Sequence, residues 1–375
     1  MERDVLAAPY GAVSVTPVPL PPEQGVHITP ASGVRTIGVL TGGGDCPGLN
    51  PAIRAVVGRA SQYGIHSTGI EEGWRGLVER LSRPLDFTDV EEILPLGGTI
   101  LGTSRTNPLK DEQSMQAVLR NISDLGLDAI VAIGGDDTLS VAAALAERGI
   151  KVVGVPKTMD NDIPLTDYTF GFDTAVTISV EAIERLRDTG RSHRRVMVLE
   201  VMGRNAGWVA LWSGLAGGAD WIAIPEVPLD LDELCDHLKA LHERGKRYAV
   251  VVASESVDIP GLAGDGAGKD EFGHEELKKR GVGPFLADTI EERTGFETRA
   301  TVIGHVQRGG SPTVFDRILA TRMGVAAMDL VSKGIFGKMV ALQQNEIVAV
   351  DLQAIAGKQK LVPRELYDIS RTFFR

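Results

Sequence analysis

The sequence predicts an α/β protein with two doubly wound domains, each built on a mainly parallel sheet, and an active site in the cleft between them. Three observations carry this prediction. From about residue 35, short apolar runs alternate with amphipathic helical stretches, the pattern of parallel strands covered by helices on both faces. The chain has 375 residues, more than the roughly 250–300 that one core supports. Polar, glycine-rich loops follow the apolar runs, where doubly wound folds bind ligands.

The composition argues against several classes of function. A net charge of −11 argues against a general nucleic-acid or anionic-membrane surface, although a local arginine cluster or a metal could still bind anionic substrates. No apolar run approaches the roughly 18 residues of a membrane span. Cys46 and Cys235 fit no metal or redox spacing. We therefore expect a cytoplasmic protein that binds neither nucleic acid nor membrane.

The elements are expected in the following order. Residues 1–34 carry proline or glycine every few positions and predict a flexible extension, with no secretory signal. A strand over 36–40 leads through a glycine loop to a helix over 50–64, which Asn50 caps. Strands over 128–134 and 151–155 flank a helix over 139–148.

The second half repeats this alternation. The leucine spacing from residue 231 to residue 241 predicts a helix. The segment 261–275 is rich in glycine and charge and predicts a flexible surface connection. Apolar runs predict strands over 195–201, 221–226, 247–254 and 299–305.

The loop after the first strand, TGGGDCPGLN, offers backbone N–H groups and a helix start to an anion. It is neither a dinucleotide fingerprint nor a P-loop, because Pro47 replaces the third glycine and Leu49-Asn50 replaces Lys-Ser/Thr. A tight turn without a ligand is an equally good interpretation of this motif. Arg105, in a later polar loop, is by itself no more than a solvated side chain.

Two further loops indicate chemistry more strongly. In IGGDDT, Asp136 and Asp137 follow a buried strand, where a carboxylate suits Mg²⁺. The alternative is that Asp137 or Thr138 only caps the next helix. In VPKTMDNDIP, the residues from Lys157 to Asp162 supply a cation, a hydroxyl and a candidate general base. The alternative there is an Asx-rich turn.

The later strand ends add cations. Arg204 and Glu255 each follow a strand, and the spacing from His305 to Arg308 suits joint capture of one phosphate. A single histidine at a strand end is more often structural, but here an arginine and paired glycines stand beside it. Carboxylates with Mg²⁺ on one side and an arginine–histidine pair on the other predict phosphoryl transfer.

At this point the chain resembles the 6-phosphofructokinase family. The resemblance rests on seven motifs that occur in the family's order from about Thr36 to about Leu330: IGVLTGGGDCPGLNPAIR, GGTILGTSR, IGGDDT, PKTMDNDI, YTFGFDTA, EVMGRNAGW and TVIGHVQRGGSP. It implies a transferase of glycolysis and gluconeogenesis that phosphorylates fructose 6-phosphate to fructose 1,6-bisphosphate with Mg²⁺. It also implies a homo-oligomer, a dimer or tetramer.

The resemblance assigns roles to individual residues. Asp160 would be the general base, Thr158, Asp162 and Arg204 would complete the catalytic set, and Asp136 would hold Mg²⁺. Gly43, Gly44, Arg105, Asp137, Thr138 and Lys157 would form the donor side. Arg195 and Arg299 would reach across from a neighbouring subunit. The sugar phosphate would contact Thr158, Asp160, Arg195, Met202, Gly203, Arg204, Glu255, Arg299, His305 and Arg308.

The resemblance also divides the chain. It implies a donor and magnesium domain at 35–172 with about 306–345, and a sugar-phosphate domain at 173–305 with 346–375.

The identity of the phosphoryl donor is inferred from two residues at which this chain departs from the ATP-dependent members. Where ATP-dependent members usually have glycine, this chain has Asp137 and Lys157. A carboxylate near the α-phosphate of ATP would repel it by about 4 kcal/mol at 4 Å and an effective dielectric of 20, and the lysine supplies a cation beside the transferred group. The chain therefore resembles the pyrophosphate-dependent members. The alternatives are an ATP-dependent 6-phosphofructokinase and a non-catalytic sugar-phosphate-binding subunit, which the intact Asp160 disfavours.

Overall fold

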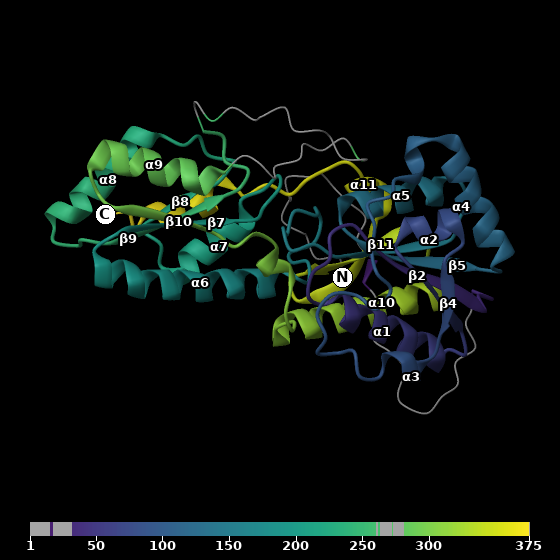
Figure 1. Cartoon of the computed structure of the whole chain (residues 1–375). Coiled ribbons are helices and arrows are strands. Elements are labelled where there is room, and N and C mark those ends of the chain that lie inside the picture. The colour runs from purple at the N-terminus through teal and green to yellow at the C-terminus, as the bar shows by residue number, and fades with distance from the viewer. Residues whose placement is uncertain (1–15, 18–31, 260–261, 263–271, 273–280, 375) are drawn as a thin grey trace, which may run out of the picture. The chain divides into compact units, whose positions relative to one another are not determined.

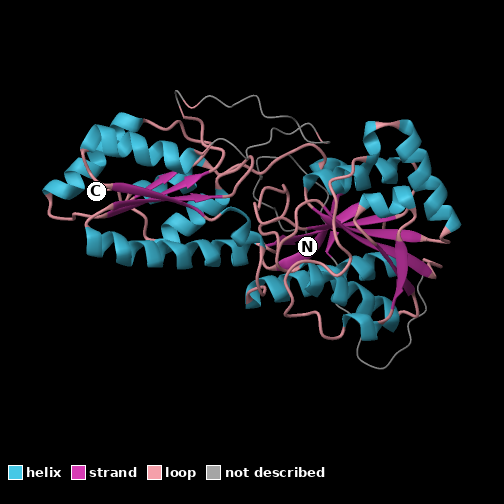
Figure 2. Cartoon of the chain, in the orientation of Figure 1, coloured by secondary structure: helices cyan, strands magenta, loops and turns pink. Residues whose placement is uncertain are grey.

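The computed structural model describes residues 16–17, 32–259, 262, 272 and 281–374. The chain forms two compact units and passes between them five times along its sequence. Unit 1 takes its described residues from 1–157, 163–170 and 317–358, and unit 2 takes its described residues from 158–162, 171–316 and 359–375. Each sheet is flanked by helices (Figures 1 and 2).

Unit 1 contains an eight-stranded sheet in the order β1-β12-β11-β6-β5-β2-β3-β4. The central strands are parallel, whereas β4, β12 and β1 run antiparallel to their neighbours. The bounds are β1 Thr16–Pro17, β2 Thr36–Gly42, β3 His66–Ile70, β4 Ser82–Leu85, β5 Ala129–Gly134, β6 Val152–Pro156, β11 Lys338–Gln343 and β12 Glu346–Asp351.

Helices cover both faces of this sheet. One face buries alternate residues of the central strands, such as Val39 and Val131, against α1 and α10, and Figure 1 shows α3 on the same side. On the other face α5 and α11 pack together, as do α2 and α4. The bounds are α1 Leu49–Gln62, α2 Trp74–Glu79, α3 Phe87–Val90, η1 Pro108–Lys110, α4 Glu112–Asp124, α5 Asp136–Glu147, α10 Val314–Lys333 and α11 Leu352–Ile355.

Unit 2 contains a four-stranded parallel sheet in the order β10-β7-β9-β8. Helices α8 and α9 cover one face, which buries Val198 and Val251, while α6 and α7 cover the other (Figure 1). The bounds are α6 Phe172–His193, β7 Val196–Val201, α7 Trp208–Gly217, β8 Trp221–Ala223, α8 Leu231–Glu243, β9 Ala249–Ser254, α9 Val282–Thr294, β10 Thr298–Val302, η2 Gly304–Arg308 and α12 Arg364–Arg371.

The predicted fold class is confirmed, because both sheets are mainly parallel and lie between helices. Several details differ. Helix α5 begins at Asp136 rather than at 139, so the two aspartates lie in its first turn. Asn50 does not cap α1, whose N-cap is Gly48. The Asn50 side chain instead bonds the backbone of Leu96, Gly97 and Ile100, which fixes the loop that faces this helix.

The unit boundaries also differ from those expected. The strand β12 lies in unit 1 rather than in the second domain, because it pairs along its whole length with β11. The residues up to Asp316 stay in unit 2, where the first turn of α10 bonds the start of α6. Most of the expected extension 1–34 and most of the connection 261–275 lie outside the described residues.

Two further observations concern the described part of the chain. Cys46 and Cys235 are both buried thiols. Within the described ranges, no helix is both long enough and apolar enough to cross a membrane.

Candidate active site

The loop after β2 opens the candidate site in unit 1. Gly43 has a φ of +79°, a left-handed conformation that glycine adopts without strain. Its N–H donates to the Ser104 carbonyl at 3.2 Å, and its carbonyl accepts from the Thr103 hydroxyl at 2.6 Å. The loop that carries the exposed Arg105 is therefore bonded directly to the loop that carries Gly43 and Gly44.

The two aspartates of IGGDDT follow the fully buried strand β5. They form the first turn of α5, where the helix dipole favours negative charge. The N-cap of this helix is Gly135, which has no side chain of its own to cap it. The Asp136 carboxylate accepts from the Ser140 hydroxyl at 3.4 Å. Both carboxylates thus stand at the carboxyl edge of the unit 1 sheet, as predicted.

Lys157 is a buried cation, with 2 % of its surface exposed. Its ammonium donates to the carbonyl of Gly44, and its N–H donates to the Gly134 carbonyl at 2.9 Å. A Cβ placed on Gly43 would lie 3.8 Å from the Lys157 Nζ and 3.7 Å from the Thr138 Oγ1. The Thr138 hydroxyl and the Lys157 ammonium therefore both lie close to the backbone of Gly43 and Gly44 in unit 1.

The side chains present can be compared with the ligands that Mg²⁺ prefers. Among the described residues, no group of three or more His, Cys, Asp or Glu side chains is arranged to hold an ion. Mg²⁺ does not need such a cage, because it usually binds one or two carboxylates together with substrate phosphates and waters. Asp136, a hard oxygen donor beside the glycine loop, fits a Mg²⁺ ion that arrives with a phosphorylated substrate.

The loop Thr158–Asp162, which carries the expected base, belongs to unit 2 although Lys157 belongs to unit 1. The N–H of Asp160 donates to the Thr158 hydroxyl at 3.1 Å. Asn161 has a φ of +52°, which asparagine tolerates better than most residues. The Asp160 Oδ1 is buried and accepts no hydrogen bond from any described residue. This oxygen is available as a hydrogen-bond acceptor for a ligand.

Two adjacent parallel strands of unit 2 bring Gly203 and Glu255 together. Gly203 follows β7, Glu255 follows β9, and the Gly203 N–H lies 3.4 Å from the Glu255 carboxylate. The Gly203 carbonyl accepts from Ser256 at 2.7 Å. Gly203 has a φ of +153°, and a Cβ there would lie 2.8 Å from the Ala206 carbonyl. Only glycine fits this position.

The ionisation of Glu255 is strongly altered. Burial and, after it, the charge of Asp160 raise the pKa of Glu255 to about 7, while the Gly203 N–H and the Arg308 guanidinium lower it. These electrostatic effects show that Asp160 and Arg308 lie near Glu255. Three residues from separate loops of unit 2 are therefore near one another.

Gln307 is a residue that our sequence reasoning missed. It is fully buried in η2, between the exposed His305 and the half-buried Arg308. Its Oε1 accepts from the Met202 N–H at 2.7 Å, and its Nε2 donates to the Ser179 hydroxyl at 2.8 Å. Gln307 thus fixes the backbone that leads into Gly203 and Arg204. The only sequence signal was its place in the GHVQRGG motif.

Arg195 and Arg299 do not join this group. They lie at the amino ends of β7 and β10, whereas the other residues lie at the carboxyl ends, about 20 Å away for a six-residue strand. One oxygen of Glu297 accepts from both guanidinium groups, at 2.8 and 2.6 Å. The hydrogen bond from Arg195 holds the pKa of Glu297 below its ordinary value.

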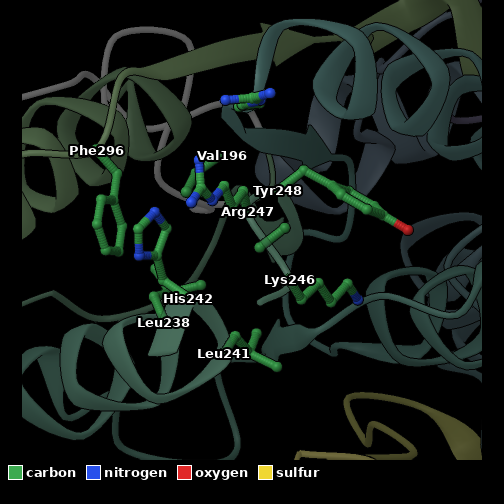
Figure 3. Close-up of a pocket in the computed structure, with 10 residues that line it drawn as sticks. Val196, Leu238, Leu241, His242, Lys246, Arg247, Tyr248 and Phe296 are labelled. Carbon is green, nitrogen blue, oxygen red and sulfur yellow. The ribbon is translucent and has the colours of Figure 1, made fainter. Parts of the chain in front are cut away.

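A small pocket also lies at the amino ends of the unit 2 strands (Figure 3). The rings of His242 and Phe296 stack at 4.6 Å in it, and the Lys246 ammonium lies 5.1 Å from the centre of the Tyr248 ring. Lys246 also forms an ion pair with Asp220. None of the expected site residues lines this pocket.

Most of this chain is similar in sequence to a known family and to characterised relatives. Residues 36–331 match the family model described as phosphofructokinase. The pyrophosphate–fructose 6-phosphate 1-phosphotransferase of Dictyoglomus thermophilum is 52% identical over 341 residues, which cover 90% of this chain and 98% of that protein. The ATP-dependent 6-phosphofructokinase 3 of Streptomyces coelicolor is 48% identical over 334 residues, which cover 88% of this chain and 97% of that protein.

A solved structure supports the fold. The pyrophosphate-dependent phosphofructokinase from Marinobacter aquaeolei superimposes with a TM-score of 0.76 at 22% identity, covering 91% of this chain and 92% of that one. At that identity the likeness concerns the fold and not the substrate. Relatives named for pyrophosphate and relatives named for ATP are both similar, so the donor has to be argued from residues.

Proposed function

The chain belongs to the phosphofructokinase family, and on that premise we propose that it transfers a phosphoryl group reversibly from inorganic pyrophosphate to the 1-hydroxyl of fructose 6-phosphate. The product is fructose 1,6-bisphosphate, and the reaction serves glycolysis and gluconeogenesis. The choice of pyrophosphate as donor rests on two residues of unit 1, Asp137 and the buried Lys157.

On the acceptor side, Asp160 takes the proton of the attacking hydroxyl. Its buried Oδ1 accepts from no described residue, so a sugar hydroxyl can use that oxygen without displacing a protein donor. Thr158 bonds the backbone of Asp160, and Asp162 closes the same loop. Glu255 and Arg308, which act electrostatically on one another, contact the sugar phosphate together with Met202, Gly203, Arg204 and His305.

On the donor side, the glycine loop and Thr138 bind pyrophosphate. The Lys157 ammonium, held by the Gly44 carbonyl, neutralises charge that develops during transfer. Asp137 occupies the first turn of α5, a place where a longer nucleotide donor would otherwise meet helix N–H groups. Its negative charge favours the shorter donor. Gly43, Gly44 and Arg105 complete this side.

Asp136 would hold Mg²⁺, which supplies electrostatic stabilisation of the phosphate oxygens when bound. The carboxylate fits this role because it stands in the first turn of α5 beside the glycine loop, with hard-oxygen chemistry. We also place the reaction in the cytoplasm, because its substrates are multiply charged phosphates and charge crosses a hydrocarbon layer at great cost.

We further propose that the working enzyme is a homo-oligomer, a dimer or tetramer. Arg195 and Arg299 stand at the opposite strand ends from the remaining sugar-phosphate residues. Within one chain they are therefore far from Gly203 and Glu255 on the same sheet. In the proposal they complete the sugar-phosphate site of a neighbouring subunit.

The decisive experiment compares pyrophosphate with ATP as donor for fructose 6-phosphate in the presence of Mg²⁺. We expect the wild-type enzyme to use pyrophosphate with the higher kcat/KM. Asp137→Gly combined with Lys157→Gly should move the ratio of kcat/KM values toward ATP by at least about tenfold, which corresponds to about 1.4 kcal/mol of differential binding.

Asp160→Ser serves as the control, because it should abolish turnover with both donors while fructose 6-phosphate still binds. A donor preference that does not move in the double variant would show that Asp137 and Lys157 do not select the donor. Wild-type preference for ATP would favour the ATP-dependent alternative. The 48% identical relative from Streptomyces coelicolor is named for that donor. Turnover retained by Asp160→Ser would remove that residue from the role of base.

A further inference from the structure

The segment that begins at residue 359 returns to unit 2 after 42 residues in unit 1 (317–358) and meets the loop Thr158–Asp162. The Lys360 N–H donates to the Asp162 carbonyl at 2.7 Å. The Lys360 ammonium donates to the Asn161 Oδ1 at 3.1 Å. One residue, about 200 positions away in the sequence, thus holds two consecutive members of the loop, and these members directly follow Asp160.

Lys360 is itself fixed on two sides. The Trp208 Nε1 donates to the Lys360 carbonyl at 2.7 Å, and the Lys360 ammonium lies 5.1 Å from the centre of the Trp208 ring, a cation–π distance. Two residues further on, the Val362 N–H donates to the Glu226 carboxylate at 2.9 Å. The same carboxylate accepts from the Gly207 N–H at 3.0 Å. Lys360 is therefore anchored to the start of α7.

The loop needs such support because of its conformation. Asn161 is 1 % exposed and adopts a left-handed φ of +52°, which a side chain other than glycine adopts at some cost. The bond to the Thr158 hydroxyl fixes the loop before Asp160, and Lys360 fixes it after Asp160. An ångström of misplacement at a reacting group can lower a rate by about 10²-fold.

We propose that Lys360 is a positioning residue for phosphoryl transfer. It sets the place of the Asp160 carboxylate by holding Asn161 and Asp162, and it does so without touching either substrate. The inference rests on the proposed function, in which Asp160 is the base. Lys360 lies beyond residues 36–331, the part of the chain that the family model matches.

The test uses Lys360→Met, which keeps the length of the side chain but removes its charge and its hydrogen bond to Asn161, while the backbone bond to Asp162 remains. We expect kcat to fall at least about tenfold while the KM for fructose 6-phosphate stays within about twofold, because an interaction that matters only in the transition state lowers kcat alone. Lys360→Arg retains a cation and a donor and should recover most of the lost kcat.

Lys358→Met is the matched control. Lys358 is exposed and donates to the Ala354 carbonyl within its own segment, so its loss should leave kcat and KM unchanged. Calorimetric titration with fructose 6-phosphate counts the competent sites, so that a partly unfolded sample lowers the stoichiometry and not the kcat per site. Trp208→Phe provides a second test of the positioning role. It removes the indole N–H that bonds the Lys360 carbonyl, and it should also lower kcat without changing KM.

Three results would overturn the proposal: a kcat per site for Lys360→Met within twofold of wild type, a rise in KM without a fall in kcat, or no recovery in Lys360→Arg. If Lys360→Met binds no sugar phosphate, Lys360→Arg and Trp208→Phe decide by the same criteria. Failure of the proposed function looks different. In that case the wild-type enzyme turns over fructose 6-phosphate with neither donor, or Asp160→Ser keeps its activity.

Discussion

Glu255 directly follows β9, and burial raises its pKa to about 7 from an ordinary 4.5. Between these two pH values the folded protein keeps a proton that the unfolded chain has lost. The contribution of Glu255 to the free energy of unfolding is therefore largest at low pH and declines as pH rises from 4.5 to about 7. A shift of this size corresponds to about 3 kcal/mol.

Glu255→Gln should remove that dependence. Urea denaturation across this pH range should show the wild-type protein losing up to about 3 kcal/mol relative to the variant as pH rises. Glu297→Gln is the contrasting control, because the bond from Arg195 holds the Glu297 pKa below its ordinary value. The stabilisation from Glu297 is present above its unfolded pKa and is lost as pH falls. The contribution of Glu297 to the free energy of unfolding therefore rises with pH, opposite to that of Glu255. A flat difference curve for Glu255→Gln would contradict the raised pKa.

At this same scale, site residues that follow strands or lie in motifs could be named from the sequence, whereas residues whose contacts depend on the tertiary fold could not. Asp160, Glu255 and Arg308 follow strands or belong to a motif, and charge after a buried strand is itself a signal. Gln307 carries no charge, and its role depends on a bond to the Met202 N–H that sequence spacing does not reveal. Lys360 meets its partners only through the tertiary fold.

At the scale of elements, the first turn of α10 caps α6. Helix α6 has no side-chain cap of its own. The buried Asp316 instead accepts from the Thr174 N–H at 2.8 Å and from the Thr174 hydroxyl at 2.5 Å. Burial raises the pKa of Asp316 to about 6. Two buried donors of one helix start thus depend on a carboxylate 142 residues away in the sequence.

Asp316→Ala should therefore lower the free energy of unfolding by about 2–4 kcal/mol, because it leaves both donors of Thr174 buried without an acceptor. Chemical denaturation at pH 7.5 measures this loss. Thr177→Ala is the matched control on the same helix: its exposed hydroxyl bonds only the Asp173 carbonyl one turn earlier, and its loss should cost no more than about 0.5 kcal/mol. Equal effects of the two variants would refute the capping role.

Elements were predictable where one period dominated. The buried strands β2, β5, β6, β7 and β9 were visible as continuous apolar runs. The start of α5 was not, because helix propensity disfavours two adjacent aspartates while the helix dipole stabilises them in a first turn. The membership of β12 in unit 1 depends on its antiparallel pairing with β11, a long-range property that local composition does not encode.

At the scale of the whole molecule, the positions of Arg195 and Arg299 lead to a complementation test. A chain with Asp160→Ser lacks the base, and a chain with both arginines changed to alanine lacks the residues proposed to serve its neighbour. Each should be nearly inactive alone, the first in kcat and the second through a high KM for fructose 6-phosphate. In a mixed oligomer, the site with the intact Asp160 would receive intact arginines from the other chain.

Co-expression of the two variants should therefore restore activity. For random pairing into isologous dimers we expect about a quarter of the wild-type activity, since half of the dimers are mixed and one of their two sites is complete. Each variant expressed alone is the control. Activity of the mixture that equals the sum of the separate variants would show that the arginines do not act between subunits.

The interleaving of the two units has a consequence for biosynthesis. Unit 1 lacks β11 and β12 until residue 351 has been made, and unit 2 lacks the Lys360 anchor and α12 until residue 371 has been made. Many multidomain proteins fold their first domain while the ribosome is still translating the next. Here neither unit has all of its strands and helices until these late residues have been made. A stop codon before residue 338 should therefore remove elements from both units rather than from one.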